Sequence, residues 1–185
     1  MKYSKVLIAG IILVLSGSIM SSCSGSFRRK MMTEIKTVEL NRFLGTWYEI
    51  ARFPHRFERG LTGVTATYKL RDDGMIEVIN KGYMNSLDGE EKIAVGKAKV
   101  ASKDGKGHLK VSFFWIFYAD YFILELDQQD YSYALIGSSS DTYLWILSRK
   151  PEMEKATLDM LLKRAEELGY DLSKVEFVQQ KTMNN

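Results

Sequence analysis

Short runs of alternating apolar and polar residues follow one another through the middle of the chain. Eight such runs occur, at residues 46–53, 63–70, 75–83, 92–100, 108–115, 121–126, 131–137 and 142–149. A period of two residues predicts a β-strand that turns one face toward an apolar interior and the other toward solvent. The pattern therefore predicts eight strands and an all-β domain.

The connections between these runs are short and rich in turn residues. Asp-Gly pairs stand at 73–74, 88–89 and 104–105, and this dipeptide favours tight hairpins. The gaps leave no room for crossover helices, so neighbouring strands must pair antiparallel. Eight such strands close most simply into an up-and-down barrel, which leaves no exposed edge, although a two-sheet sandwich would use the same strands.

One helix is predicted after the last strand. Its apolar positions recur at helical spacing, at Leu158, Leu161, Leu162, Ala165 and Leu168. Pro151 and Glu152 suit the first turn of a helix, and Gly169 suits its C-terminal cap. A single apolar stripe must lie against another element, so we expect this helix to pack on the outer wall of the barrel. The run 174–180 predicts an additional edge strand.

The N-terminal segment differs from the rest of the chain. Lys2 and Lys5 precede an unbroken apolar run at 6–15, and small residues then lead to Cys23. Ten helical residues span about 15 Å, which is half of the hydrocarbon core of a bilayer. Residues 1–22 therefore predict a secretory signal peptide rather than a membrane span, with a short uncleaved anchor as the alternative.

Cys23 is the single cysteine of the chain, which excludes an intrachain disulfide framework and a cysteine-rich zinc site. Its setting resembles the lipobox of bacterial lipoproteins, which implies cleavage just before Cys23 and acylation of its thiol. Two or three acyl chains would anchor the protein stably in a membrane. The alternative is ordinary cleavage nearby that leaves a free thiol. We expect residues 23–37 to form the lipidated N-terminus and tether, 38–180 the folded domain, and 181–185 a disordered tail.

Composition and charge narrow the class of protein. Hydrophobic residues make up 45% of the 185 residues and charged residues 26%, which suits one domain with a substantial core and excludes wholesale disorder. The formal net charge is +3, and removal of Lys2 and Lys5 with the leader would leave +1. This small excess lacks the concentrated positive stripe of a nucleic-acid binder.

The segment 45–49, Gly-Thr-Trp-Tyr-Glu, resembles the G-x-W signature of the lipocalins, with a short helical turn at 38–44 leading into the first strand. The stretches 45–70 and 143–151 resemble the bacterial and apolipoprotein D branch of that family, and Arg149 matches its closing arginine. The resemblance covers 38–180 and departs from the family around Asp127 and Tyr131, where the middle motif is weak. It implies an eight-stranded lipocalin barrel, anchored by lipid to the bacterial outer membrane and facing the periplasm.

The first and last strands are expected to meet at the closed end of the barrel. Alternation places two sets of side chains on one face each, namely Trp47, Glu49, Ala51 and Phe53, and Tyr143, Trp145, Leu147 and Arg149. Trp47 can then lie beneath the Arg149 guanidinium, in a cation–π contact worth about 0.5–2 kcal/mol. We expect Gly45, Trp47 and Arg149 to form this closed-end motif. The alternative is Trp47 as plain core and Arg149 in solvent.

A ligand pocket is expected above this floor. Resemblance to the ligand-lining positions of apolipoprotein D implies that the pocket is lined by Tyr68, Asn80, Phe113 and Trp145. On the fourth strand we expect Ala94, Gly96 and Ala98 to point inward, because Lys97 and Lys99 occupy the other face. Such an interior suits a molecule with a long apolar tail, whose head group would meet His55, Arg56, Arg59 and Lys81 at the mouth. The alternative is that the aromatic side chains simply fill a small barrel.

No catalytic constellation is found in the sequence. His55 and His108 are the only histidines and lack zinc-site spacing, and neither a G-x-S-x-G elbow nor a phosphate-binding loop occurs. A His55–Glu58 pair could do acid–base work, but we favour a charged loop at the barrel mouth.

We therefore predict neither enzyme activity, nor a cofactor, nor a metal, nor a nucleic-acid partner. The sequence favours a membrane-anchored lipocalin that stores or transports a fatty acid or lysophospholipid. The alternatives are a lipocalin-fold enzyme acting on an apolar substrate and a structural envelope protein with a filled barrel.

Overall fold

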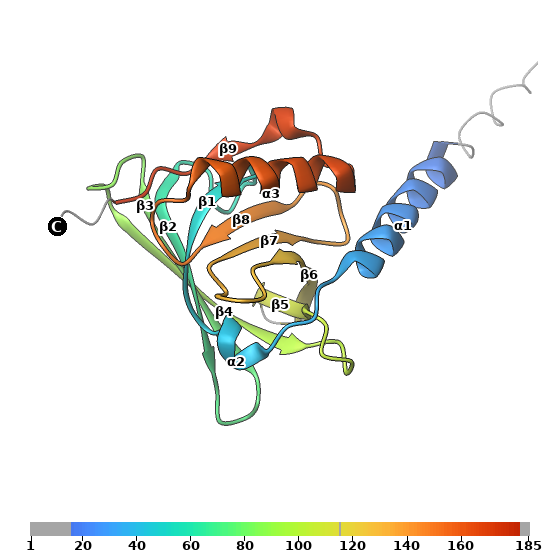
Figure 1. Cartoon of the computed structure of the whole chain (residues 1–185), viewed down its shortest axis with the longest axis horizontal. Coiled ribbons are helices and arrows are strands. Elements are labelled where there is room, and N and C mark those ends of the chain that lie inside the picture. Colours follow the sequence, from blue (N-terminus) through green and yellow to red (C-terminus); the bar gives the residue numbers. More distant parts are fainter. Residues whose placement is uncertain (1–15, 115, 182–185) are drawn as a thin grey trace, which may run out of the picture.

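Eight antiparallel strands form a closed barrel in which each strand pairs with the next in sequence (Figure 1). The computed structural model describes residues 16–114 and 116–181. The strands are β1 (Gly45–Arg52), β2 (Leu61–Leu70), β3 (Ile76–Met84), β4 (Glu91–Val100), β5 (His108–Phe114), β6 (Phe117–Leu126), β7 (Tyr133–Gly137) and β8 (Leu144–Ser148). All eight predicted strands and the barrel are confirmed, and the sandwich is excluded because β1 pairs with both β2 and β8.

Strand β1 closes the barrel by dividing its length between two neighbours. Residues 45–48 pair with β2, and residues 48–52 pair with β8. Where β1 has left β2, the short strand β9 (Glu176–Phe177) pairs with Ala51 and Arg52. This confirms the edge strand that the run 174–180 predicts, and it covers backbone that would otherwise be unpaired.

A β-bulge at Ile50 changes which side chains of β1 point inward. Glu49 lies opposite Leu147, but the next paired residue, Ala51, lies opposite Ile146. The extra residue reverses the alternation beyond this point. Our expectation that Ala51 and Phe53 share the inner face with Trp47 and Glu49 is therefore wrong. Ala51 and Phe53 instead join the apolar cluster on the outer wall, and Arg52 turns inward.

Helix α3 (Lys155–Leu168) lies against the outer wall of the barrel, as predicted (Figure 1). Leu161, Ala165 and Leu168 are buried there against side chains of the strands. The helix begins at Lys155 and not at Pro151, because Glu154 has the extended backbone of an N-cap and the chain must first cross from the end of β8 to the outer wall.

Gly169 ends helix α3 as predicted. It adopts a φ of 100° and donates its N–H to the carbonyls of Ala165 and Glu166. This left-handed conformation favours glycine and satisfies carbonyl groups at the helix end. The chain continues through a 3₁₀ turn (Leu172–Lys174) to β9.

Helix α1 (Ser16–Glu34) stands beside β6, and its N-terminal half projects away from the barrel (Figure 1). Met31 is fully buried against the outer cluster, and the Phe27 ring meets the Tyr170 ring edge-on at 5.4 Å. Much of the segment expected as a tether is thus helical and partly docked. Residues 1–15 of the predicted leader, Trp115, and residues 182–185 of the predicted tail lie outside the described residues. Among the described helices, none combines the length and apolarity that a membrane crossing requires.

The short helix α2 (Leu40–Phe43) covers one end of the barrel and meets Trp47 and Arg149 there. The Trp47 ring is fully buried, its Nε1 donates to the Phe43 carbonyl at 2.8 Å, and the Arg149 guanidinium lies 3.8 Å from the ring centre. The guanidinium also donates to backbone carbonyls of Arg42, Phe43, Leu44, Thr46 and Tyr131. Gly45 has a φ of 94°, a left-handed conformation that favours glycine. A Cβ atom added to it would lie 3.4 Å from Arg149 Nη1, so a side chain at this position would be strained.

We expect the Trp47 and Arg149 side chains to couple energetically. Trp47→Ala should lower the free energy of unfolding by about 3–5 kcal/mol, as truncation of a large buried aromatic does. Arg149→Ala should cost less, and a double-mutant cycle by urea denaturation should give an interaction of at least about 0.5 kcal/mol, as for residues in contact. Lys155→Ala, on the exposed start of α3, serves as the distant control and should be additive with Trp47→Ala. Strict additivity of the Trp47 and Arg149 variants would contradict the closure described here.

Candidate ligand-binding site

The inside of the barrel is lined by apolar side chains from strands around its circumference. The buried members are Phe43, Trp47, Tyr68, Ile76, Val78, Ala98, Leu109, Ile123, Leu126, Tyr131, Ala134, Ile136 and Leu147. Inward positions two residues apart on paired strands produce this continuous lining. The lining lies above the floor formed by Trp47 and α2, so it is closed at one end.

Three of the five residues predicted to line the pocket belong to this interior. Tyr68 and Ala98 are buried in it, and Trp145 packs against it from the mouth side. Asn80 is half-buried, and its register opposite Ala66 places it on the same inner face. Tyr68, Ala98 and Trp145 thus belong to one lining, and Asn80 lies on the same inner face in the middle of β3.

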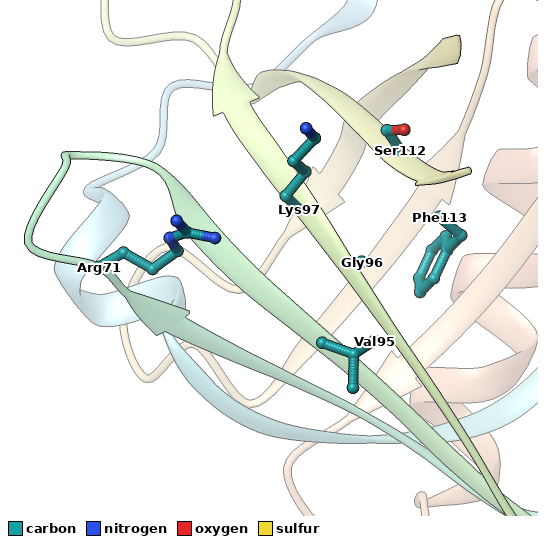
Figure 2. A pocket seen from close by; sticks show the side chains of 6 residues that line it. All are labelled: Arg71, Val95, Gly96, Lys97, Ser112 and Phe113. Atoms are coloured by element: carbon teal, nitrogen blue, oxygen red, sulfur yellow. The ribbon is translucent and has the colours of Figure 1, made fainter. Parts of the chain in front are cut away.

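Phe113 occupies a different environment, because 45% of its surface is exposed at the mouth. Its ring lies beside Gly96 of β4, and a Cβ on Gly96 would come within 2.7 Å of that ring (Figure 2). The absence of a side chain at Gly96 therefore lets the ring approach the β4 backbone. A shallow pocket of about 230 Å³ lies here, lined by Arg71, Val95, Gly96, Lys97, Ser112 and Phe113.

Two tyrosine hydroxyls meet within the apolar interior. Tyr68 Oη and Tyr121 Oη are 2.8 Å apart, so one hydroxyl donates a hydrogen bond to the other. Burial is the main reason that the pKa of both phenols is raised well above the ordinary value. Both hydroxyls are therefore neutral near pH 7, and they form a polar point in an otherwise apolar lining.

A buried ionic network lies nearer the mouth, on the inner face of β1. Arg52 Nη1 donates to Glu49 Oε1 at 2.8 Å, and Arg52 Nη2 donates to the carbonyls of Glu58 and Leu61 at 3.0 Å each. Both side chains are about 5% exposed. Burial, and next the charge of Glu58, raises the pKa of Glu49 from 4.5 to about 8, although Arg52 opposes this shift.

A second polar group joins the loop after β1 to the last strand. His55 Nε2 lies 2.7 Å from Glu58 Oε2, and Trp145 Nε1 donates to the same oxygen at 3.3 Å. The Tyr143 and Trp145 rings stack with their centres 5.8 Å apart, and the His55 ring lies edge-on to Trp145 at 5.5 Å. The expected charged loop does lie at the mouth, and within it the His55 and Glu58 side chains are only 10% and 9% exposed.

The sequence predicted only part of the two polar groups at the mouth, Glu49 with Arg52 and His55 with Glu58 and Trp145. Glu49 and Arg52 are three residues apart, which puts them on opposite faces of a regular strand. The bulge at Ile50 brings both inward, and no turn residue or glycine in the sequence signals it. The Glu58 contact with Trp145 joins residues 87 positions apart and depends on barrel closure.

We expect the buried Glu49 carboxyl to make stability fall as pH rises from about 5 to about 8. Its pKa is about 8 in the folded protein against 4.5 when exposed, so the folded state binds more protons in this interval and loses stability as they leave. Glu49→Gln removes this ionisation and keeps an oxygen acceptor for Arg52. Urea unfolding at several pH values should therefore show a flatter slope for Glu49→Gln than for the wild type. Equal slopes would mean that Glu49 ionises normally.

Comparison with known proteins agrees with this architecture. A lipocalin-like domain model matches residues 38–180. The outer membrane lipoprotein Blc of Vibrio cholerae is 43% identical over 170 residues, which cover 92% of this chain and 98% of that protein. The Blc protein of Escherichia coli K12 is 46% identical over 159 residues, covering 86% and 89%. Bovine apolipoprotein D is 33% identical over 136 residues, covering 66% and 67%.

Solved structures show the same fold at lower identity. The cockroach allergen Per a 4 aligns with a TM-score of 0.63 at 22% identity, over 80% of this chain and 91% of that one. Lobster apocrustacyanin A1 aligns with a TM-score of 0.63 at 21% identity, over 84% and 86%. Lipocalins are generally binding proteins for small hydrophobic molecules rather than enzymes. The chain therefore belongs to the lipocalin family, and its similarity to the Blc lipoproteins supports the bacterial outer membrane as its location.

Proposed function

We propose that this protein holds the acyl chain of a fatty acid or lysophospholipid inside its barrel and stores or transports it in the cell envelope. The observation that carries the proposal is the apolar inner lining, closed by Trp47 and Arg149 at one end and bordered by polar side chains at the other. This arrangement suits an amphiphile with its tail inside and its head group at the mouth. The protein acts as a binding module and not as an enzyme, tethered to the periplasmic face of the outer membrane through acylated Cys23.

Hydrophobic capture supplies the affinity. Enclosing about 200–300 Å² of acyl surface at about 25 cal/mol per Å² gives about 5–7.5 kcal/mol before the cost of ordering the ligand. This range is compatible with micromolar affinity. Small side chains favour such an occupant on β4, where Ala98 faces Ile76 and Gly96 faces Val78.

The head group is expected to lie among the polar side chains of the mouth. Arg56 and Arg59 are exposed on the loop after β1, next to the buried His55–Glu58 pair. Lys81 is already paired with Glu91 at 2.9 Å, so it is a weaker candidate for an anionic head group. Arg56 and Arg59, which are exposed at the rim, therefore suit a carboxylate or phosphate.

We expect Ala98→Phe to block ligand binding, because the added ring fills the interior where Ala98 is fully buried. Fatty acid binding can be followed by tryptophan fluorescence, and Trp145→Phe should remove most of the signal while Trp47 and Trp115 are retained. Ala98→Phe should cost only about 1–3 kcal/mol of stability in urea, the usual effect of overpacking. Ala156→Phe, on the exposed surface of α3, is the matched control and should bind as the wild type does.

Fatty acid binding to Ala98→Phe with wild-type affinity would mean that the ligand does not enter the barrel. Failure of the wild type to bind any acyl ligand would instead favour a structural envelope protein with a filled barrel. Turnover of an added ester substrate by the wild type would favour the enzyme alternative.

We expect Cys23→Ser to release the protein from the membrane, because the only thiol that can be acylated is removed. In a Gram-negative host, a palmitate analogue should label the wild type and not the variant, and the variant should appear in the soluble periplasmic fraction. Ser24→Ala keeps the thiol and should retain both label and membrane location. An unlabelled and soluble wild type would contradict the lipoprotein assignment.

A further inference from the structure

Solvent-accessible space extends into the barrel along β6. Tyr121 belongs to the inner lining together with Ile123, two residues further along the strand, but it is only partly buried. Ala119, two residues nearer the mouth, lies opposite Val111 of the same lining and is exposed. Side chains that point inward and still contact solvent border open space. A molecule that enters the barrel can therefore reach Tyr121.

The hydroxyls of Tyr68 and Tyr121, which we call the deep hydroxyl pair, lie near the closed end of the barrel. Tyr68 is opposite Gly45 at the start of β1, and its ring centre is 5.4 Å from that of Phe43 in α2. Strand β1 covers about 23 Å between Gly45 and Arg52 at the mouth, at about 3.3 Å per residue. The deep hydroxyl pair is therefore far from the polar side chains that border the mouth.

The deep hydroxyl pair has one more hydrogen-bond donor than it uses. Each phenol carries a single O–H donor, and the 2.8 Å contact between the two oxygens uses one of the two donors. Within residues 16–114 and 116–181, neither hydroxyl makes a hydrogen bond to any other protein group. One O–H therefore remains for a partner that is not part of this chain.

The spare donor belongs to Tyr121. Tyr68 is 4% exposed, whereas Tyr121 is only partly buried and borders the open space. A buried O–H without an acceptor is destabilising, so Tyr68 is best satisfied when it donates to Tyr121 and leaves the Tyr121 proton free to meet water or a ligand. Burial raises the pKa of both phenols, which keeps both protonated near neutral pH.

We propose that Tyr121, held in place by Tyr68, donates a hydrogen bond to an oxygen atom in the distal half of the ligand, so that the barrel prefers hydroxylated acyl chains. This inference rests on the proposed function, because it names the class of acyl chain that the same barrel takes. Tyr121 is the specificity-determining residue, and Tyr68 is a positioning residue that acts through it.

The preference arises from what each ligand leaves unsatisfied. An unsubstituted chain that fills the space displaces water from the Tyr121 hydroxyl and offers no acceptor in its place, and this loss weakens binding. A chain with a distal hydroxyl displaces the same water and accepts the hydrogen bond. Sites that hydrogen-bond a ligand hydroxyl discriminate strongly against analogues that lack it. A hydroxyl next to the carboxyl end stays near the mouth and gains nothing.

Displacement of a fluorescent fatty acid from the full-length, acylated protein in nanodiscs measures this preference. The competitors are stearic acid, 12-hydroxystearic acid and 3-hydroxystearic acid, which have the same chain length, and empty nanodiscs correct for partition into lipid. We expect 12-hydroxystearic acid to bind at least about tenfold more tightly than stearic acid, since it alone satisfies the spare donor. 3-Hydroxystearic acid should bind within about twofold of stearic acid.

Single-atom variants assign the preference to the deep hydroxyl pair. Tyr121→Phe keeps the ring and removes the donor, so the affinity ratio of 12-hydroxystearic to stearic acid should fall to about one while stearic acid binds at least as well as before. Tyr68→Phe should lower the ratio in part, because Tyr121 keeps its donor but loses its partner. Tyr133→Phe removes a hydroxyl from a partly buried ring on the outer wall and should keep the wild-type ratio.

The ratio separates recognition from a merely structural role, because loss of stability alone would weaken both ligands equally. Equal binding of 12-hydroxystearic and stearic acid to the wild type overturns the inference, and so does a ratio that survives Tyr121→Phe. Weaker binding of stearic acid itself to Tyr121→Phe would mean that the carboxylate reaches the deep hydroxyl pair, which also overturns it. A wild type that binds none of the three acids would overturn the proposed function together with this inference.

Discussion

The Arg149 guanidinium holds together the chain segments that meet where the barrel closes. It stacks on Trp47 and donates to the backbone carbonyls of residues 42–44, Thr46 and Tyr131. A half-buried charge needs such partners, and carbonyls at the end of a short helix need donors, since an unsatisfied buried polar group costs about 1–3 kcal/mol. The Arg149 guanidinium and these carbonyl groups therefore satisfy each other by hydrogen bonding. Helix α2 can therefore cover one end of the barrel, and access to the interior is left to the opposite end.

The polarity of that opposite end depends on the bulge in β1. By adding one residue at Ile50, β1 turns Arg52 inward beside Glu49 while Ala51 and Phe53 pack outward near α3. One irregular residue thus supplies both a charged group to the mouth and apolar surface to the outer wall. The Glu49 and Arg52 side chains are each about 5% exposed, so this part of the mouth is shielded from water even though it borders the open end.

The barrel is also unequal around its circumference. On one side, α3 and β9 cover the outer wall near β1 and β8. On the other side, among the residues that the structure describes, β4 pairs with β5 only from Lys97 onward, and Phe114 and Phe117 are 74% and 68% exposed. Helix α1 joins the outer cluster through Met31 and reaches β6 through Arg28. The outer wall is therefore covered near β1 and β8 and exposed beside β4 and β5.

The sequence by itself determined the strands, because period-two alternation and Asp-Gly turns are local signals. The closed barrel and the closed-end residues Gly45, Trp47 and Arg149 followed from the resemblance to the lipocalins, and the pairing of β1 with both β2 and β8 excluded the sandwich. The sequence also placed Tyr68, Ala98 and Trp145 on inward positions, since parity within a regular strand is fixed. Tertiary structure alone decided the inward turn of Arg52, the burial of His55 and Glu58, and the exposure of Phe113. These depend on a bulge, on contact between residues 87 positions apart, and on where two strands separate. The physical reason is that bulges and strand separation follow from the geometry of closing a twisted sheet, which no short stretch of sequence encodes.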